Sequence, residues 1–191
     1  MMALKRELPS RKEEHGMTTK PGRAEVGGLG QYARRVDVGS SVWYLGNLFT
    51  ILAGSEDTGG RFALIEIRAR KGTEPPRHVH HREDEAFYVL EGEITFYIGD
   101  ETYAATPGTF VFAPRGIPHS WVVETDVVRK LVTLTPGGAD EHFRDPRFGE
   151  PARTPTLPPQ PEEVPDVAAL VADMERYGVE VVGPPGPPMQ G

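Results

Sequence analysis

Two histidines and a glutamate in the run 72–92 restrict how this part of the chain can fold. His78 and His80 are separated by one residue, so both imidazoles leave the same face of an extended strand. Four residues then intervene before Glu85, which is enough for a tight turn that returns the chain beside the histidine strand. The aromatic and β-branched run 86–90 predicts a second strand. We therefore expect two neighbouring strands that bring two imidazoles and one carboxylate to one point.

A second stretch supplies a third imidazole. Residues 108–118 are a short apolar run followed by a turn rich in Pro and Gly, and His119 comes directly after them. Together the candidate ligands are His78, His80, Glu85 and His119. Three imidazoles and one carboxylate form a borderline nitrogen and oxygen set, which suits Mn, Fe, Co, Ni, Cu or Zn rather than Ca or Mg. We predict one divalent transition metal, whose identity the ligand types leave open.

Side-chain alternation along the same strands predicts which residues share the interior with the metal. Counting by twos from Glu85 gives Phe87 and Val89, and counting by twos from His119 gives Trp121 and Val123. These four side chains are candidate walls of a substrate pocket, and ordinary core packing is the alternative for each of them. Between the strands, the polar run 81–84 is expected to form an exposed turn in which His81 is not a ligand.

Charge and composition exclude several classes of partner. The chain has 191 residues, a net charge of −7 and no basic run, which argues against nucleic acid and against an anionic membrane surface. It has no cysteine, so disulfides and thiolate metal sites are excluded. Neither a signal-peptide core nor a long apolar segment occurs, and we expect a soluble cytoplasmic protein.

The pattern from residue 41 onward indicates an all-β fold. Short apolar runs alternate with turn signals, and this spacing is typical of a sandwich or barrel of antiparallel strands. The predicted strands cover 42–45, 47–53, 62–67, 93–98, 101–105, 109–113, 120–124 and 129–135, besides the two around the histidines. A short helical turn at 139–143 is expected to carry His142 outward.

The ends of the chain differ in composition from this middle part. We divide the chain into a flexible extension (1–30), a barrel (31–148), a Pro-rich linker (149–165) and a C-terminal helix with a disordered tail (166–191). Met17 is a plausible true start. Asp166 is suited to cap the helix and Gly178 to end it. The helix is expected to dock on the barrel's outer face or on one of its mouths.

The two histidine-containing stretches resemble the two motifs of the cupin family. Their spacings read G-x5-H-x-H-x4-E-x6-G and G-x5-P-x-G-x2-H, and every ligand position is filled. Val123 stands where many cupins have Asn. The resemblance implies a single-cupin jelly-roll barrel, or double-stranded β-helix, with a short C-terminal helix. It also implies that the chain forms a homodimer.

Within the cupins, the layout is similar to that of bacterial quercetinase-like proteins. The likeness covers the run 45–54, the segment 135–138 and the Glu-His-Phe at 141–143. It implies a metal-dependent dioxygenase of the quercetin 2,4-dioxygenase type, which acts with O2 on a flavonol or a related enol or phenol. Glu85 would then be both a ligand and the catalytic base. Two alternatives stay open: a non-oxidative isomerase, cyclase or decarboxylase, and a small-molecule-binding cupin, which is disfavoured because no DNA-binding region accompanies the barrel.

Overall fold

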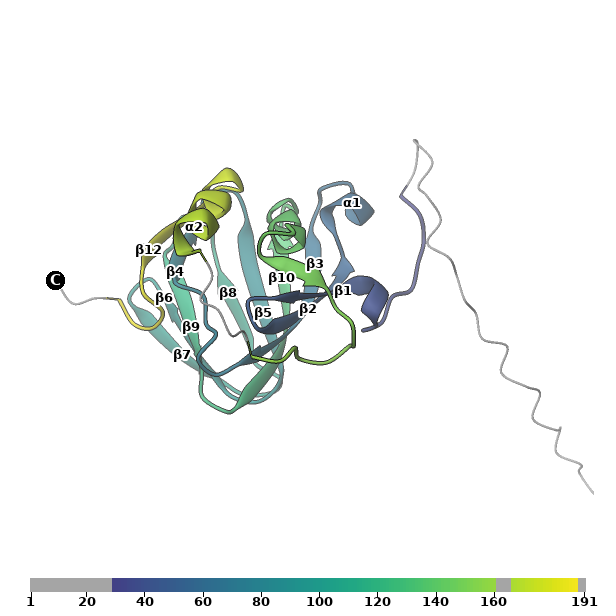
Figure 1. Ribbon diagram of the computed structural model, residues 1–191. Coiled ribbons are helices and arrows are strands. Elements are labelled where there is room, and N and C mark those ends of the chain that lie inside the picture. Colours follow the sequence, from purple (N-terminus) through teal and green to yellow (C-terminus); the bar gives the residue numbers. More distant parts are fainter. Residues whose placement is uncertain (1–28, 161–165, 189–191) are drawn as a thin grey trace, which may run out of the picture.

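The computed structural model describes residues 29–160 and 166–188, and these residues form two antiparallel β-sheets (Figure 1). One sheet has the strand order β11-β1-β2-β3-β10-β5-β8 and the other has the order β12-β4-β9-β6-β7. The strands are β1 (Ser41–Tyr44), β2 (Asn47–Ala53), β3 (Ala63–Arg70), β4 (Arg77–His80), β5 (Asp84–Glu91), β6 (Ile94–Ile98), β7 (Glu101–Ala105), β8 (Phe110–Ala113), β9 (His119–Val123), β10 (Val127–Thr135), β11 (Gly149–Pro151) and β12 (Val179–Gly183). The predicted all-β cupin barrel with a short C-terminal helix is confirmed.

The pairing of β5 with β10 orders the barrel interior by depth. The buried pairs, beginning at the end that carries the candidate metal ligands, are Glu85↔Leu134, Phe87↔Val132 and Val89↔Lys130. Alternate residues of both strands face the same interior because side chains of a strand alternate between its two faces. The first layer contains a candidate ligand, the Phe87 ring of the second layer lies edge-on to His119 with ring centroids 6.5 Å apart, and the third layer lies in the core.

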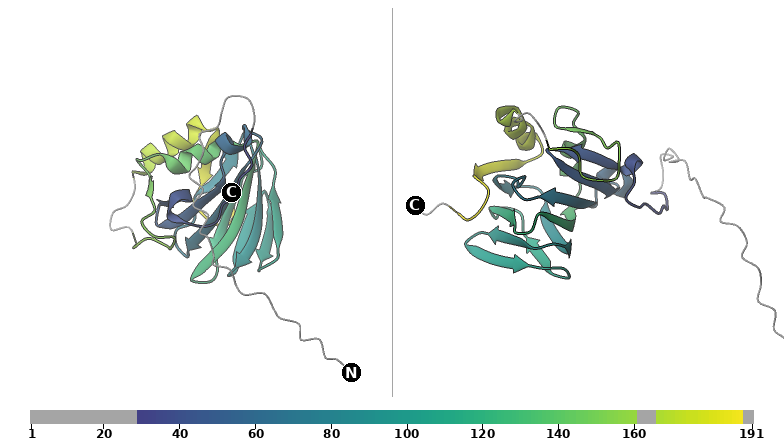
Figure 2. Two further views of the ribbon diagram at one scale, coloured as in Figure 1. Left: turned by 90° about the vertical axis from the view of Figure 1, so that its right-hand side faces the viewer. Right: turned by 60° about the horizontal axis from the view of Figure 1, so that its bottom comes forward.

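Short helices gather at one end of the barrel (Figures 1 and 2). They are α1 (Ser55–Thr58), the 3-10 helix η2 (Ala139–Arg144) and α2 (Val167–Arg176), while the 3-10 helix η1 (Val38–Ser40) precedes β1. In both figures α2 and η2 lie side by side. None of the helices in the described residues is long and apolar enough to cross a membrane.

Helix α2 begins and ends where the sequence predicts. The Asp166 carboxylate accepts a hydrogen bond from the Ala169 amide at 3.0 Å, and Gly178 follows the helix with a φ of 79°. Leu170 and Met174 are buried in the core. After the helix, the structure has a strand, β12, that the sequence analysis does not predict: the short run Val-Glu-Val-Val, just before the predicted disordered tail from Gly183, adds an edge strand to the sheet.

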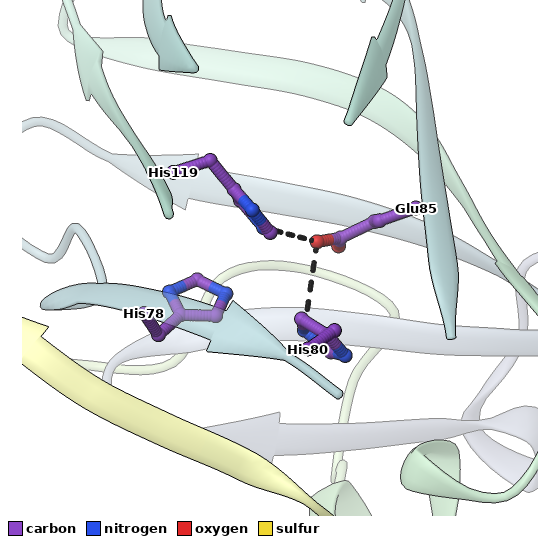
Figure 3. A group of neighbouring side chains, drawn as sticks. All are labelled: His78, His80, Glu85 and His119. Carbon is purple, nitrogen blue, oxygen red and sulfur yellow. Dashed lines mark hydrogen bonds and ion pairs between the residues drawn. The ribbon is translucent and has the colours of Figure 1, made fainter. Parts of the chain in front are cut away.

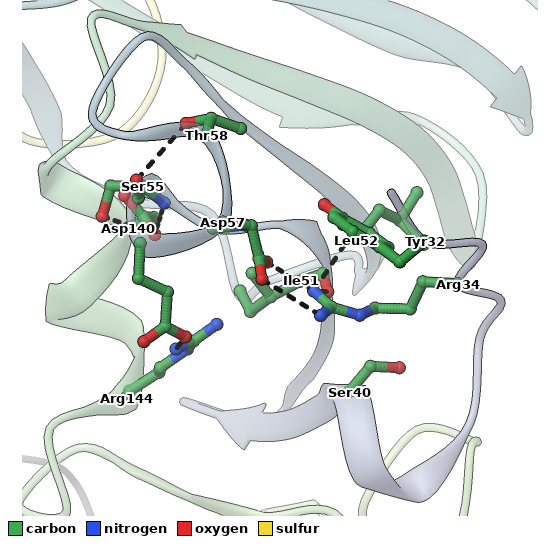
Figure 4. A network of polar contacts seen from close by, with 12 residues as sticks. Tyr32, Arg34, Ser40, Ile51, Leu52, Ser55, Asp57, Thr58, Asp140 and Arg144 are labelled. Carbon is green, nitrogen blue, oxygen red and sulfur yellow. Dashed lines mark hydrogen bonds and ion pairs between the residues drawn. The ribbon is translucent and has the colours of Figure 1, made fainter. Parts of the chain in front are cut away.

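Polar contacts hold η2 against α1 (Figure 4). The Asp140 carboxylate accepts hydrogen bonds from the Ser55 amide at 2.9 Å and from the Gly138 amide at 3.0 Å, and Arg144 pairs with Glu56 at 2.5 Å. These contacts turn His142 into the molecule. The prediction that His142 points outward is therefore wrong, since its side chain is buried.

The N-terminal part of the described chain lies against the same region. Arg34 makes two hydrogen bonds to the Asp57 carboxylate, at 2.7 and 3.3 Å, and further bonds to the carbonyl groups of Ile51 and Leu52 (Figure 4). Residues 1–28 of the predicted extension, Met17 among them, lie outside the described residues. Within the predicted linker, β11 pairs with β1.

Candidate metal centre

Three strands bring the four candidate ligands together. His78 and His80 come from β4, Glu85 from the start of β5 and His119 from the start of β9 (Figure 3). One ligand atom from each residue lies within 4.8 Å of the others, and all four side chains are buried. The single-residue spacing in β4 and the turn to β5 therefore place these side chains as the sequence predicts.

Contacts between the two motif turns fix this arrangement. Arg115 binds the Asp84 carboxylate through its side chain, at 2.7 and 3.0 Å, and through its backbone amide at 3.0 Å. The Gly116 amide, in a turn that requires a φ of 78°, donates to the His80 carbonyl at 2.8 Å. The turn that precedes His119 is thus bound to the strands that carry the other ligands.

Two imidazoles are oriented by backbone carbonyls. The Nδ1 atom of His78 lies 2.8 Å from the Pro76 carbonyl oxygen, and Nδ1 of His119 lies 3.0 Å from the Ile117 carbonyl oxygen. A carbonyl only accepts, so Nδ1 carries the proton in both rings. A ring that carries its one proton on Nδ1 offers the lone pair of its Nε2 atom to the centre, which is the outer-sphere arrangement found around metal-binding histidines.

The third imidazole has a carboxylate as its outer partner. His80 Nδ1 lies 3.4 Å from Glu83 Oε2, and Glu83 is buried. The prediction that residues 81–84 form an exposed turn is wrong for Glu83, because its side chain folds inward to His80. His81 is exposed and pairs with Glu180 at 2.8 Å, away from the cluster.

The electrostatics of the cluster favour a bound cation. Burial alone would raise the pKa of Glu85, but the contact with His119 Nε2 at 2.9 Å, together with the nearby His80 and His78, lowers that pKa to about 2. Burial, together with His119 and His80, lowers the pKa of His78 to about 3. For His80, Glu83 and Glu85 outweigh burial and raise the pKa. An ionised carboxylate among imidazoles whose free nitrogens converge fits a divalent transition metal.

A cavity of about 1150 Å³ opens beside the cluster and includes His78, His80 and Glu85 in its wall. Its described lining is largely apolar and aromatic. Trp121 is in this lining, whereas Phe87, Val89 and Val123 are buried in the core and do not line the cavity. Alternation correctly gives the inner face of the strand for these four residues. Phe87, Val89 and Val123, however, lie deeper in the barrel or among more side chains than Trp121 does.

Another part of the cavity wall comes from segments that the sequence pattern did not connect with the site. It includes Tyr44 of β1, His142 and Phe143 of η2, Phe148, and the α2 residues Leu170 and Met174. His142 and Phe143 belong to the Glu-His-Phe at 141–143 that marks the quercetinase likeness, and this was the one signal that could have pointed to them.

Comparisons with known proteins agree with this geometry. Residues 66–135 match the cupin domain family. The chain is 28% identical over 137 residues to quercetin 2,3-dioxygenase of Bacillus subtilis, a match that covers 72% of this chain and 40% of the length of that protein.

Two solved structures show modest similarity to this chain. KdgF from Halomonas sp. is 21% identical, with a TM-score of 0.46 over 50% of this chain and 85% of that one. A predicted oxalate decarboxylase from Thermotoga maritima is 20% identical, with a TM-score of 0.45 over 47% of this chain and 80% of that one. Residues 66–135 therefore form a cupin domain, and over 137 residues the chain resembles a quercetinase.

Proposed function

We propose that this protein is a metal-dependent dioxygenase that cleaves a flavonol, or a related enol or phenol, with O2. The observation that carries the proposal is the opening of a three-imidazole, one-carboxylate cluster onto a large aromatic cavity. Catalytic metal sites keep a side open to substrate, whereas structural sites are closed by protein ligands. The match to the Bacillus subtilis quercetin 2,3-dioxygenase supports the substrate class.

His78, His80, His119 and Glu85 would hold the metal, which when bound supplies Lewis acidity toward a substrate hydroxyl group. Glu85 would take the proton from this hydroxyl, because it is the carboxylate of the cluster and it faces the cavity. The outer partners of the histidines keep the ring nitrogens aimed at the centre. The apolar walls receive a planar aromatic molecule and exclude water.

Oxygen consumption tests the proposal. Protein loaded separately with Ni, Co, Mn, Fe and Cu is mixed with quercetin, and protein with His80→Ala serves as the blank. Metal-dependent uptake of O2 with loss of the flavonol absorbance is the expected result. No uptake with any of the five metals, in protein shown to contain the metal, would contradict the proposal and favour a non-oxidative cupin enzyme.

A further inference from the structure

Three buried polar side chains form a hydrogen-bonded relay, the Tyr44–His142–Asp173 relay, at the cavity wall formed by β1, η2 and α2. The Tyr44 hydroxyl lies 2.5 Å from His142 Nε2, and His142 Nδ1 lies 2.6 Å from the Asp173 carboxylate. Tyr44 and His142 line the cavity that also contains three of the candidate metal ligands, and Asp173 lies buried behind them. The Tyr44–His142–Asp173 relay has no part in the chemistry proposed above.

The protons in the Tyr44–His142–Asp173 relay can be placed from the hydrogen bonds that Asp173 and His142 make. Burial alone would raise the pKa of Asp173, but hydrogen bonds from His142 and from Arg147, at 2.6 and 2.5 Å, outweigh burial and lower it. Arg176 adds a further bond at 2.9 Å. Asp173 is therefore an ionised acceptor, and Nδ1 of His142 carries the proton that it accepts.

The tautomer of His142 decides what Tyr44 offers to the cavity. Burial lowers the pKa of His142, so the ring is neutral at neutral pH and its Nε2 atom is an acceptor. The Tyr44 hydroxyl then donates its one proton to His142 and keeps only acceptor capacity. Burial also raises the pKa of Tyr44, so the group remains a phenol and not a phenolate.

The surroundings make this arrangement rigid. The Tyr44 ring packs edge-on against Phe49 and Phe143, with ring centroids 5.2 and 5.3 Å apart, and η2 is fixed to α1 by the Asp140 contacts (Figure 4). A fixed acceptor in an apolar wall distinguishes a ligand that donates a hydrogen bond from one that cannot. With the second kind of ligand, the acceptor would lose its hydrogen bond to water and gain none from the ligand.

We propose that Tyr44, held by His142 and Asp173, binds a hydroxyl group of the substrate remote from the hydroxyl that faces the metal ligands. The inference rests on the proposed function, because it takes the occupant of the cavity to be an aromatic enol or phenol. It adds that the preferred substrate is hydroxylated at both ends. Tyr44 is the residue that contacts the ligand, and His142 and Asp173 are positioning residues.

Equilibrium binding of two flavonols to the full-length protein loaded with Zn, which has no redox chemistry, tests this inference without turnover. Quercetin carries remote hydroxyl groups, and 3-hydroxyflavone shares the metal-facing end but lacks them. In Tyr44→Phe, affinity for quercetin should fall about tenfold, the value of one lost hydrogen bond, while affinity for 3-hydroxyflavone stays the same. Tyr103→Phe, an exposed tyrosine on β7, is the matched control and should change neither affinity.

Asp173→Asn gives a second test that leaves the Tyr44 ring in place. An amide that donates to His142 Nδ1 moves the ring proton to Nε2, so the Tyr44 oxygen then receives a hydrogen bond from His142. The preference for quercetin over 3-hydroxyflavone should fall about tenfold here as well. If His142 and Asp173 only held α2 against η2, the variant would instead bind both flavonols more weakly, by the same factor.

The outcomes separate the inference from the function that it builds on. Unchanged quercetin affinity in Tyr44→Phe, or an equal loss for both flavonols in either variant, would overturn the inference and leave the proposed dioxygenase standing. Failure of the parent protein to bind either flavonol would overturn the proposed substrate class, and the inference with it. Selective binding without oxygen uptake in the separate assay would support the inference and contradict the dioxygenase alone.

Discussion

Val179 lies opposite His80 in the antiparallel pair of β12 and β4, so the C-terminal segment forms part of the sheet that carries two candidate metal ligands. On its other side, β4 pairs with β9 at one position of the described register, His78↔His119. Strand β12 pairs with β4 at several positions, including Val181↔His78. The orientation of both β4 histidines therefore depends on a strand more than ninety residues away in the sequence.

Removal of α2 and β12 should weaken the metal site. A chain that ends at residue 165 loses the partner strand of β4, and we expect metal affinity to fall by about 10- to 100-fold, as when outer-sphere support of a ligand is lost. Competition with a chelator measures this affinity. A chain that ends at Pro188 keeps β12 and is the matched control. Equal metal affinity in the two shortened chains would show that β9 alone positions β4.

Glu85→Gln should separate metal binding from turnover. The amide is similar in size and keeps one oxygen, so the variant should retain much of the metal, but it cannot accept a proton. We expect the rate of metal-dependent oxygen uptake with quercetin to fall by about 10²- to 10⁴-fold. Glu101→Gln, which changes an exposed carboxylate on β7, is the matched control and should leave the rate unchanged. An undiminished rate in Glu85→Gln would remove this residue from the mechanism.

Lys130 should make stability depend on pH. Its side chain is fully buried among Trp121, Phe87 and Phe96, and its Nζ atom has no hydrogen-bond partner among the described residues. Burial lowers its pKa well below 10.5, so the folded chain releases a proton that the unfolded chain binds. The free energy of unfolding should therefore fall as pH decreases from 10.5 toward the folded-state pKa, by about 1.4 kcal/mol per pH unit from this group.

Lys130→Met should remove that contribution. Denaturant unfolding at several pH values should show a variant that is more stable than the parent at neutral pH, by a margin that shrinks as pH rises toward 10.5. Lys71→Met changes an exposed lysine and is expected to leave the pH dependence as it is in the parent. A margin that is the same at every pH would mean that Lys130 keeps its proton in the folded protein.

Local patterns were sufficient to predict the barrel strands and the convergence of the four candidate ligands, because alternation and short spacings act within a few residues. They were not sufficient for Glu83, whose inward position depends on a bond to His80 across the turn. For Phe87, Val89 and Val123, alternation identifies the inner face of a strand but not the depth along the barrel. Depth depends on which strands pair, and at what register.

The part of the cavity wall formed by β1, η2 and α2 could not be predicted from the sequence for a related reason. His142 is turned inward by contacts of its own short helix with α1, and its partners Tyr44 and Asp173 are 98 and 31 residues away along the chain. Strand β12 is four to five residues of ordinary β-forming sequence next to a Pro/Gly-rich tail, and only the open edge of β4 gives it a partner. Such contacts arise from tertiary packing and leave no periodic signal.

The most direct test of the account is the metal content of the purified protein and of its His80→Ala variant, measured after loading with Ni or Co and removal of free metal. The account predicts one ion per chain in the parent and little or none in the variant, with the far-ultraviolet circular dichroism of the barrel unchanged. His81→Ala, which alters the exposed neighbouring histidine, should bind as much metal as the parent. Equal metal content in His80→Ala and the parent would contradict the assignment of the metal centre.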